Sequence, residues 1–317
     1  MAVYIQGVGI ISPQKTLDGT FSNESKVNAI DNRFPCVEPD YSTFIDVKAI
    51  RRMSRIIRMG VTSSLIALRD STIQKPDAIV VGTALGCLED TVSFLNKLVA
   101  NKEELLNPTA FIHSTHNTIS SQIALNLQCR GYNSTYVHRN ISFESAIIDS
   151  ILLLQEGSVN TVLTGGIDEL TETSYIILKR LGYYTPEIRA GEGSSFFLLS
   201  NRKSSNAYSE IKAVETISFC SVDDVEGKMK EVLKAHGLEK VDLILSGSEV
   251  ESENEFSHVY AKFCSARNVL PFKELCGEYA TSCAFATYLA SVVLKDQKLP
   301  LAIADKGAGI SIFKHIL

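Results

Sequence analysis

The chain has 317 residues, of which 45% are hydrophobic and 21% charged, and its formal net charge is −5. This composition is typical of a globular protein with one large core or two fused ones. The negative charge argues against a nucleic-acid-binding surface, which needs a basic patch. No apolar run reaches the roughly 18 residues of a membrane-spanning helix, and no basic leader precedes an apolar segment at the start. We therefore expect a cytoplasmic protein without a membrane span.

The strands expected along the chain are short apolar runs bounded by Gly, Pro, Asn or Asp: residues 3–5, 78–81, 161–163, 195–199, 211–217, 241–245, 302–304 and 310–313. Apolar residues at helical spacing predict helices over 51–68, 118–127, 143–155, 225–235 and 279–294. The last helix is apolar almost all round, which indicates burial between two layers. Strands that alternate with helices predict an α/β architecture around a largely buried sheet.

The order of strands and helices runs once to about residue 201 and again, shortened, from about residue 209. We therefore expect two related halves packed into one unit, residues 1–205 and residues 206–317. Direct sequence identity between these halves is too weak to establish a repeat.

The cysteines are an odd, scattered set without CxxC pairs or metal-ligand spacing: Cys36, Cys87, Cys129, Cys220, Cys264, Cys276 and Cys283. A chain of this size needs no disulfide framework, so we expect reduced, mostly buried thiols. We expect neither a metal nor a cofactor.

Five segments in order resemble the β-ketoacyl-acyl-carrier-protein synthases. They are residues 6–13 (QGVGIISP), 51–55 (RRMSR), 80–86 (VVGTALG), 164–169 (TGGIDE) and 191–195 (GEGSS). Each motif alone fits a tight turn in many α/β folds, and the ordered set carries the resemblance. It implies a thiolase-like fold of five layers, α/β/α/β/α, with two pseudo-symmetric halves.

The same resemblance implies a catalytic cysteine at a strand-to-helix elbow, two histidines and a lysine. Counting from Gly131, the glycine that opens the strand, places Asn140 at the nucleophile position. A carboxamide cannot form an acyl thioester. His138 lies two residues earlier, and on an extended strand it would share a face with Asn140.

In the second half, the resemblance places Ser246 at the first histidine position, after the strand 243–245. Lys273 and Gly277 keep the frame of the lysine motif, and Glu278 stands where the second histidine should follow. A glycine turn near the end appears at residues 306–309 (KGAG). Asn140, Ser246, Lys273 and Glu278 are therefore predicted to be vestigial site positions, with no catalytic residue intact. Lys273 could then simply pair with Glu278 or Glu274.

Other polar groups have simpler interpretations. His113 and His116 precede a predicted helix, for which Thr115 or Asn117 could be the N-cap, and no metal ligand shows matching spacing. The glutamates in residues 249–255 are typical of a solvated acidic face.

A nucleophile position occupied by an amide residue, as at Asn140, resembles the chain-length factors of aryl-polyene, flexirubin and aromatic polyketide systems. We therefore expect a non-catalytic partner of an active ketosynthase in fatty acid or polyketide biosynthesis, forming a heterodimer with it or a homodimer, with an acyl carrier protein as a further possible partner. One alternative is an acyltransferase or hydrolase with another nucleophile, such as Cys283 or Cys87. The other is an active 3-oxoacyl synthase with an irregular site.

Overall fold

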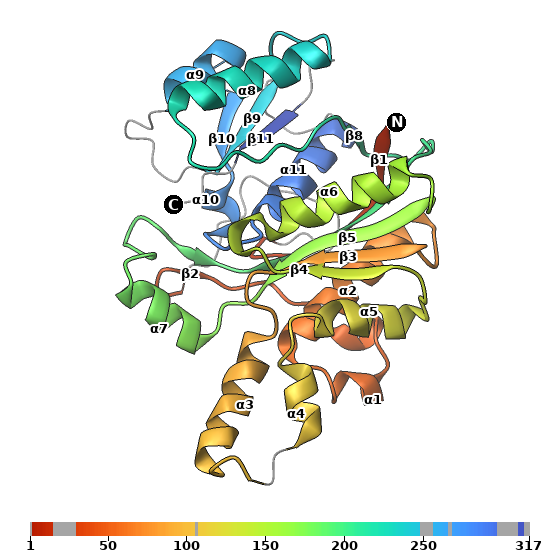
Figure 1. Ribbon diagram of the computed structural model, residues 1–317, viewed down its shortest axis with the longest axis vertical. Coiled ribbons are helices and arrows are strands. Elements are labelled where there is room, and N and C mark those ends of the chain that lie inside the picture. Colours follow the sequence, from red (N-terminus) through yellow and green to blue (C-terminus); the bar gives the residue numbers. More distant parts are fainter. Residues whose placement is uncertain are drawn as a thin grey trace.

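The structure is a computed structural model that describes residues 2–14, 30–104, 107–247, 256–265, 268–296 and 310–313. Within these residues, helices and sheets alternate in five layers (Figure 1). Two helices cover the outer face of a large sheet, two more fill the space between this sheet and a small one, and two cover the small sheet. The prediction of a five-layered α/β architecture is confirmed.

The large sheet has six strands among the described residues. In spatial order they are β4 (Asn133–Tyr136), β3 (Ala78–Gly82), β5 (Thr161–Asp168), β7 (Gly193–Ser200), β1 (Val3–Ile11) and β8 (Ser209–Ile211). The strands β4, β3 and β5 are parallel neighbours, whereas β7 is antiparallel to both β5 and β1. The central strands are buried on both faces, which explains their continuous apolar runs.

The outer face of the large sheet is covered by α2 (Arg55–Ser71) and α5 (Thr118–Leu127). The side chains of Ile56, Ile57 and Met59 on α2 are fully buried, and they belong to a cluster that includes sheet residues such as Ile79 and Leu163. The apolar stripe seen in the sequence therefore faces the sheet, as expected for an amphipathic helix.

The central layer consists of α6 (Ser142–Gln155) and α11 (Cys283–Asp296). The core around α11 combines Phe285 and Leu289 with Phe143 from α6 and with Leu245 from the small sheet. The prediction that this helix is buried between two layers is confirmed. Because this cluster takes residues from both ends of the chain, it joins the two sheets into one core.

The small sheet consists of β9 (Leu243–Ser246) between two parallel neighbours, β10 (Val269–Pro271) and β11 (Ile310–Phe313). Its outer face packs on α8 (Val222–Ala235) and α9 (Ser257–Phe263) through a separate apolar cluster. A capping box between Ser221 and Asp224 starts α8. A division of the chain near residue 205 stays a prediction, and β8, which follows that residue, still belongs to the large sheet.

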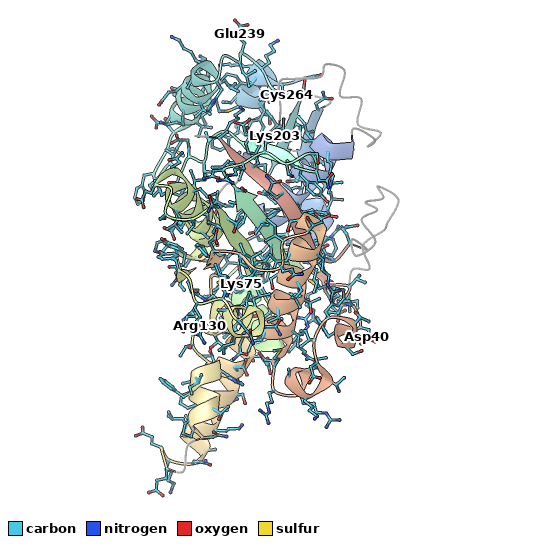
Figure 2. All side chains as sticks on the ribbon, turned by 90° about the vertical axis from the view of Figure 1, so that its right-hand side faces the viewer. Asp40, Lys75, Arg130, Lys203, Glu239 and Cys264 are labelled. Carbon is cyan, nitrogen blue, oxygen red and sulfur yellow. The ribbon has the colours of Figure 1, made fainter. Side chains whose placement is uncertain are left out.

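The remaining elements are β2 (Arg33–Phe34), which pairs with β6 (Ala190–Gly191), the 3₁₀ turns η1 (Tyr41–Thr43) and η2 (Arg139–Ile141), and the helices α1 (Val47–Ile50), α3 (Leu88–Ala100), α4 (Pro108–His113), α7 (Glu172–Arg180) and α10 (Lys273–Cys276). In both views α3 and α4 project together from the layered body (Figures 1 and 2). None of the helices in the described residues is long and apolar enough to cross a membrane.

Several predicted elements have other bounds in the structure, and the strands expected over 3–5 and 161–163 extend to Ile11 and Asp168. The helix expected from residue 51 begins at Arg55, because Ser54 is its N-cap in extended conformation. The helix expected from residue 279 begins at Cys283. The strand expected over 211–217 ends at Ile211, because its ladder partner is Val3, the first residue of β1. The strand expected at 302–304 lies outside the described residues.

Candidate functional site

The sharp turn between β4 and α6 forms an elbow at one end of the large sheet. Arg139, in the 3₁₀ turn η2, has a φ of 51°, a left-handed conformation that is uncommon for a residue other than glycine. The Oγ of Ser142 accepts a hydrogen bond from the His138 N–H at 2.8 Å and donates one to the Arg139 carbonyl at 2.7 Å, which fixes the turn. The elbow packs so closely on the end of β3 that a Cβ at Gly82 would overlap the Ser142 carbonyl.

A strained strand-to-helix turn is the geometry that presents a nucleophile in α/β enzymes. Here the strained residue is Arg139, and the predicted Asn140 follows it directly. Neither a guanidinium nor a carboxamide is a nucleophile for acyl transfer. The expectation that His138 and Asn140 share a strand face is wrong, because residues 139–141 form a helical turn. Instead His138 Nδ1 lies 3.0 Å from the Ser145 hydroxyl.

In the second half, Ser246 ends β9 and is buried. Its carbonyl accepts a hydrogen bond from the Phe272 N–H at 3.0 Å, which leads the chain from the small sheet into α10. Lys273 is the first residue of α10, and its side chain is only 6% exposed. The fold therefore places the serine and the lysine at the same end of the small sheet.

Lys273 forms an ion pair with Glu278, one of the two partners suggested by the sequence. The side chain of Glu278 is 25% exposed, so it is the member of the pair that reaches water. Its backbone joins this region to the first half, because Glu278 donates to the Arg189 carbonyl and accepts from the Gly191 N–H. Gly277, with a φ of 78°, lies against Gly191, and this contact leaves no space for a side chain at either position.

Asp168 connects the strand ends of the large sheet to the start of α11. Its carboxylate accepts hydrogen bonds from the Ala84 N–H at 2.8 Å, the Thr83 hydroxyl at 3.1 Å and the Thr281 N–H at 3.1 Å. Burial raises the pKa of Asp168, and these hydrogen bonds oppose that rise. Asp168 belongs to the motif 164–169 that the sequence analysis singled out. The hydrogen bond between Asp168 and Thr281 joins two segments whose proximity the sequence does not show.

The alternative nucleophiles are both core thiols. Cys87 is fully buried at the start of α3, and burial, followed by the nearby Asp90 and Glu169, raises the pKa of its thiol. Cys283 is buried in the cluster around α11. A reactive cysteine needs an accessible thiol, and both of these thiols are buried.

Two of the remaining candidates lie at the start of α5. Asn117 is the N-cap of α5 without a side-chain cap bond, and the His116 side chain packs against Gly86. In the part of the chain that the structure describes, no group of three or more His, Cys, Asp or Glu side chains could hold a metal ion. The acidic segment 249–255 and the glycine turn 306–309 lie outside the described residues.

Residues 31–189, half of the chain, match the family model for the β-ketoacyl synthase N-terminal domain. The chain therefore belongs to the β-ketoacyl synthase family, and its fold is thiolase-like. A search of the curated proteins gave no significant match.

Solved structures share this fold at low sequence identity. The ishigamide ketosynthase/chain length factor is 18% identical over 93% of this chain and 86% of its own, with a TM-score of 0.70. The ketosynthase AntDE, solved with the type II PKS acyl-carrier protein AntF and bound to the hexaketide, is 17% identical over 95% and 93%, with a TM-score of 0.72. A β-ketoacyl synthase from Burkholderia phymatum STM815 is 14% identical over 91% and 86%, with a TM-score of 0.60.

Proposed function

We propose that this protein is a non-catalytic partner subunit, similar to a chain-length factor, of an active ketosynthase in fatty acid or polyketide biosynthesis. The observation that carries the proposal is the elbow, where His138, Arg139 and Asn140 occupy the turn that should present a cysteine. None of these side chains can accept an acyl group as a thioester. The chain keeps the strand-to-helix turn but has no nucleophile for acyl transfer in it, as we expect for a subunit with a structural role in the complex.

The second half supports the same proposal. Decarboxylation of a malonyl donor develops negative charge that two imidazoles would stabilise in an active synthase. At the corresponding positions this chain has the hydroxyl of Ser246 and the carboxylate of Glu278. A carboxylate opposes developing negative charge, and Lys273 is already engaged by Glu278.

The partner we propose is an active ketosynthase subunit in a heterodimer, or in its absence a second copy of this chain. In the described part of the chain, β4 is the outermost strand on its side of the large sheet. An edge strand offers backbone groups for pairing with another subunit, and burial of that edge removes an aggregation hazard. The ketosynthase in one similar structure was solved with an acyl-carrier protein, which supports a carrier protein as a further partner.

The test is a condensation assay with acyl-loaded and malonyl-loaded carrier protein. We expect no turnover by the wild type, and no added acyl mass on the intact protein by mass spectrometry. Asn140→Cys and Arg139→Cys should each restore little, because each missing general acid–base or electrostatic group costs about 10²–10⁴ in rate. Turnover by the wild type, without a copurified synthase, would contradict the proposal and indicate another nucleophile.

A further inference from the structure

The outer face of α7 and the turn that follows it are apolar and exposed. Ile176 and Ile177 on the helix are 40% and 50% exposed, and Leu181 and Tyr183 in the turn are 67% and 54% exposed. We call these four residues the α7 tip. The opposite face of the helix packs on a small apolar cluster that includes Ala190 of β6. Exposed apolar side chains that gather in one place usually mark an interaction site.

The α7 tip protrudes from the molecule. Gly182, between Leu181 and Tyr183, has a φ of 82°, and a Cβ added to it would meet no atom within 4 Å. The chain therefore turns in open space, with an apolar side chain on either side of the glycine. In Figure 1, α7 lies at the periphery of the molecule, beside β2. The tip is thus accessible to a large flat surface as well as to another protein.

The charges beside the α7 tip are mainly positive. From Lys179 to Arg189 the sequence KRLGYYTPEIR has three cations and one carboxylate, although the whole chain has a net charge of −5. In the part of the chain that the structure describes, Lys179, Arg180 and Arg189 form no ion pair, and two of them lie over aromatic rings. The acidic residue at the other end of α7, Glu172, is paired with Arg33. The end of α7 that carries the tip therefore favours an anionic partner.

We infer that the α7 tip binds the surface of an anionic lipid bilayer. Aliphatic and aromatic side chains flanked by Lys and Arg are typical of segments that lie in a membrane interface, with the apolar groups below the lipid headgroups and the cations among them. Each cation near an anionic surface adds to the attraction. A protruding apolar tip needs a matching groove on a protein, whereas a bilayer yields to it. The inference goes beyond the proposed function and does not depend on the absence of catalysis.

The test is co-sedimentation of the purified full-length chain with vesicles made of equal parts of phosphatidylcholine and phosphatidylglycerol. We expect the wild type to sediment with these vesicles and not with vesicles of phosphatidylcholine alone. Salt at about 1 M should weaken the binding, because it shortens the screening length to about 3 Å. Leu181→Ser and Arg180→Glu should each lower the partition coefficient at least about tenfold, since one removes an inserted apolar side chain and the other replaces a cation with an anion.

Two matched controls make the same kinds of change away from the α7 tip. Leu152→Ser removes an apolar side chain that is 50% exposed on α6. Lys240→Glu changes the net charge as Arg180→Glu does, at an exposed position next to Glu239, which lies at the top of the molecule in Figure 2. Both controls should bind vesicles like the wild type. Circular dichroism and the urea midpoint should be unchanged in all four variants, because each replaced side chain is exposed.

A wild type that does not sediment with the anionic vesicles would overturn the inference. Equal losses for the α7 variants and the controls would also overturn it, because binding would then follow overall charge. The same variants are compared for binding to an acyl carrier protein by heteronuclear NMR. Carrier binding that depends on Leu181 and Arg180, without vesicle binding, would assign the α7 tip to an acidic protein and contradict the inference. None of these outcomes alters the condensation assay, so the inference and the proposed function fail separately.

Discussion

Arg55 and Glu192 are 137 residues apart in the chain and form a two-pronged ion pair, with both nitrogen–oxygen distances at 2.6 Å. The Glu192 side chain is only 3% exposed, and it also accepts hydrogen bonds from the N–H groups of Cys36 and Leu170. Arg55 comes from the RRMSR motif and Glu192 from the GEGSS motif. This contact gives the two motifs a common structural purpose: they fasten the start of α2 to the strand that enters the large sheet.

Replacement of Glu192 by alanine should destabilise the protein by about 2–4 kcal/mol. The change leaves Glu38 as the remaining acidic partner of the Arg55 guanidinium, and it leaves the backbone N–H groups of Cys36 and Leu170 without an acceptor. Urea denaturation would measure the loss. The matched control is Glu172→Ala, which removes an ion pair with Arg33 whose acidic partner is 67% exposed, and it should cost less than about 1 kcal/mol. Equal losses for both variants would contradict this view of Glu192.

The pair between Lys273 and Glu278 predicts an asymmetry between its two members. Glu278→Gln leaves a buried ammonium without a counter-charge and should cost about 3 kcal/mol. Lys273→Met leaves a carboxylate that already reaches water, and the methionine replaces the apolar stem, so we expect a cost of about 1 kcal/mol. The urea midpoint of each variant measures its loss of stability. A larger loss for Lys273→Met than for Glu278→Gln would contradict this prediction.

Glu169 should make the stability depend on pH. Burial raises the pKa of this carboxyl from 4.5 to about 7, although a hydrogen bond from the Glu89 N–H and the charge of Arg55 oppose the rise, and Asp90 and Glu192 add to it. Between pH 4.5 and pH 7 the unfolded chain loses this proton while the folded chain keeps it. The contribution of Glu169 to the free energy of unfolding should therefore fall as the pH rises from 4.5 to 7, and it should stay constant above pH 7.

The matching variant is Glu169→Gln, which keeps an acceptor for the Glu89 N–H. Relative to the wild type, it should become more stable as the pH rises from 4.5 to 7, by at most about 3 kcal/mol. Thermal or urea unfolding at several pH values measures the difference. A difference that is independent of pH would show that Glu169 ionises normally in the folded protein.

The left-handed backbone at Arg139 predicts a gain from glycine. Arg139→Gly removes the steric conflict of a Cβ at positive φ, and we expect stability to be unchanged or to rise by up to about 1 kcal/mol. Arg180→Gly, at the end of α7, should instead cost up to about 1 kcal/mol, since glycine is a poor helix former. A loss of several kcal/mol at position 139 would mean that the arginine side chain holds the elbow.

The sequence could predict much of the fold because burial leaves a clear pattern. The runs 78–81 and 195–199 lie on strands buried on both faces, and α11 is apolar around its circumference, as its place between two sheets requires. The helices α3 and α4 were not predicted, although Leu88, Val92, Leu95 and Val99 recur at helical spacing and give a sequence signal for α3. A signal for α7 was present in Thr171 and Ser174, which form a capping box.

The site was predicted less completely. The sequence left Glu278 and Glu274 open as partners of Lys273, and the structure shows the ion pair with Glu278. The strained position at the elbow could not be located, because Arg139 is neither glycine nor asparagine and nothing in its side chain signals a positive φ. The bonds of Asp168 to Thr281 and of Glu192 to Arg55 depend on the tertiary fold, and no local spacing encodes them.

The position of β1 has a consequence for the order of events during synthesis. This strand lies between β7 and β8, so its two ladders can form only after residues 193–211 have emerged from the ribosome. At about 5–20 residues per second, that delay is roughly 10–40 s. During this time the apolar stretch VYIQGVGII has no partner strand in the sheet, and it is free to pair with non-native strands. A nascent chain of this design would benefit from a chaperone that holds its first strand until the sheet can close around it.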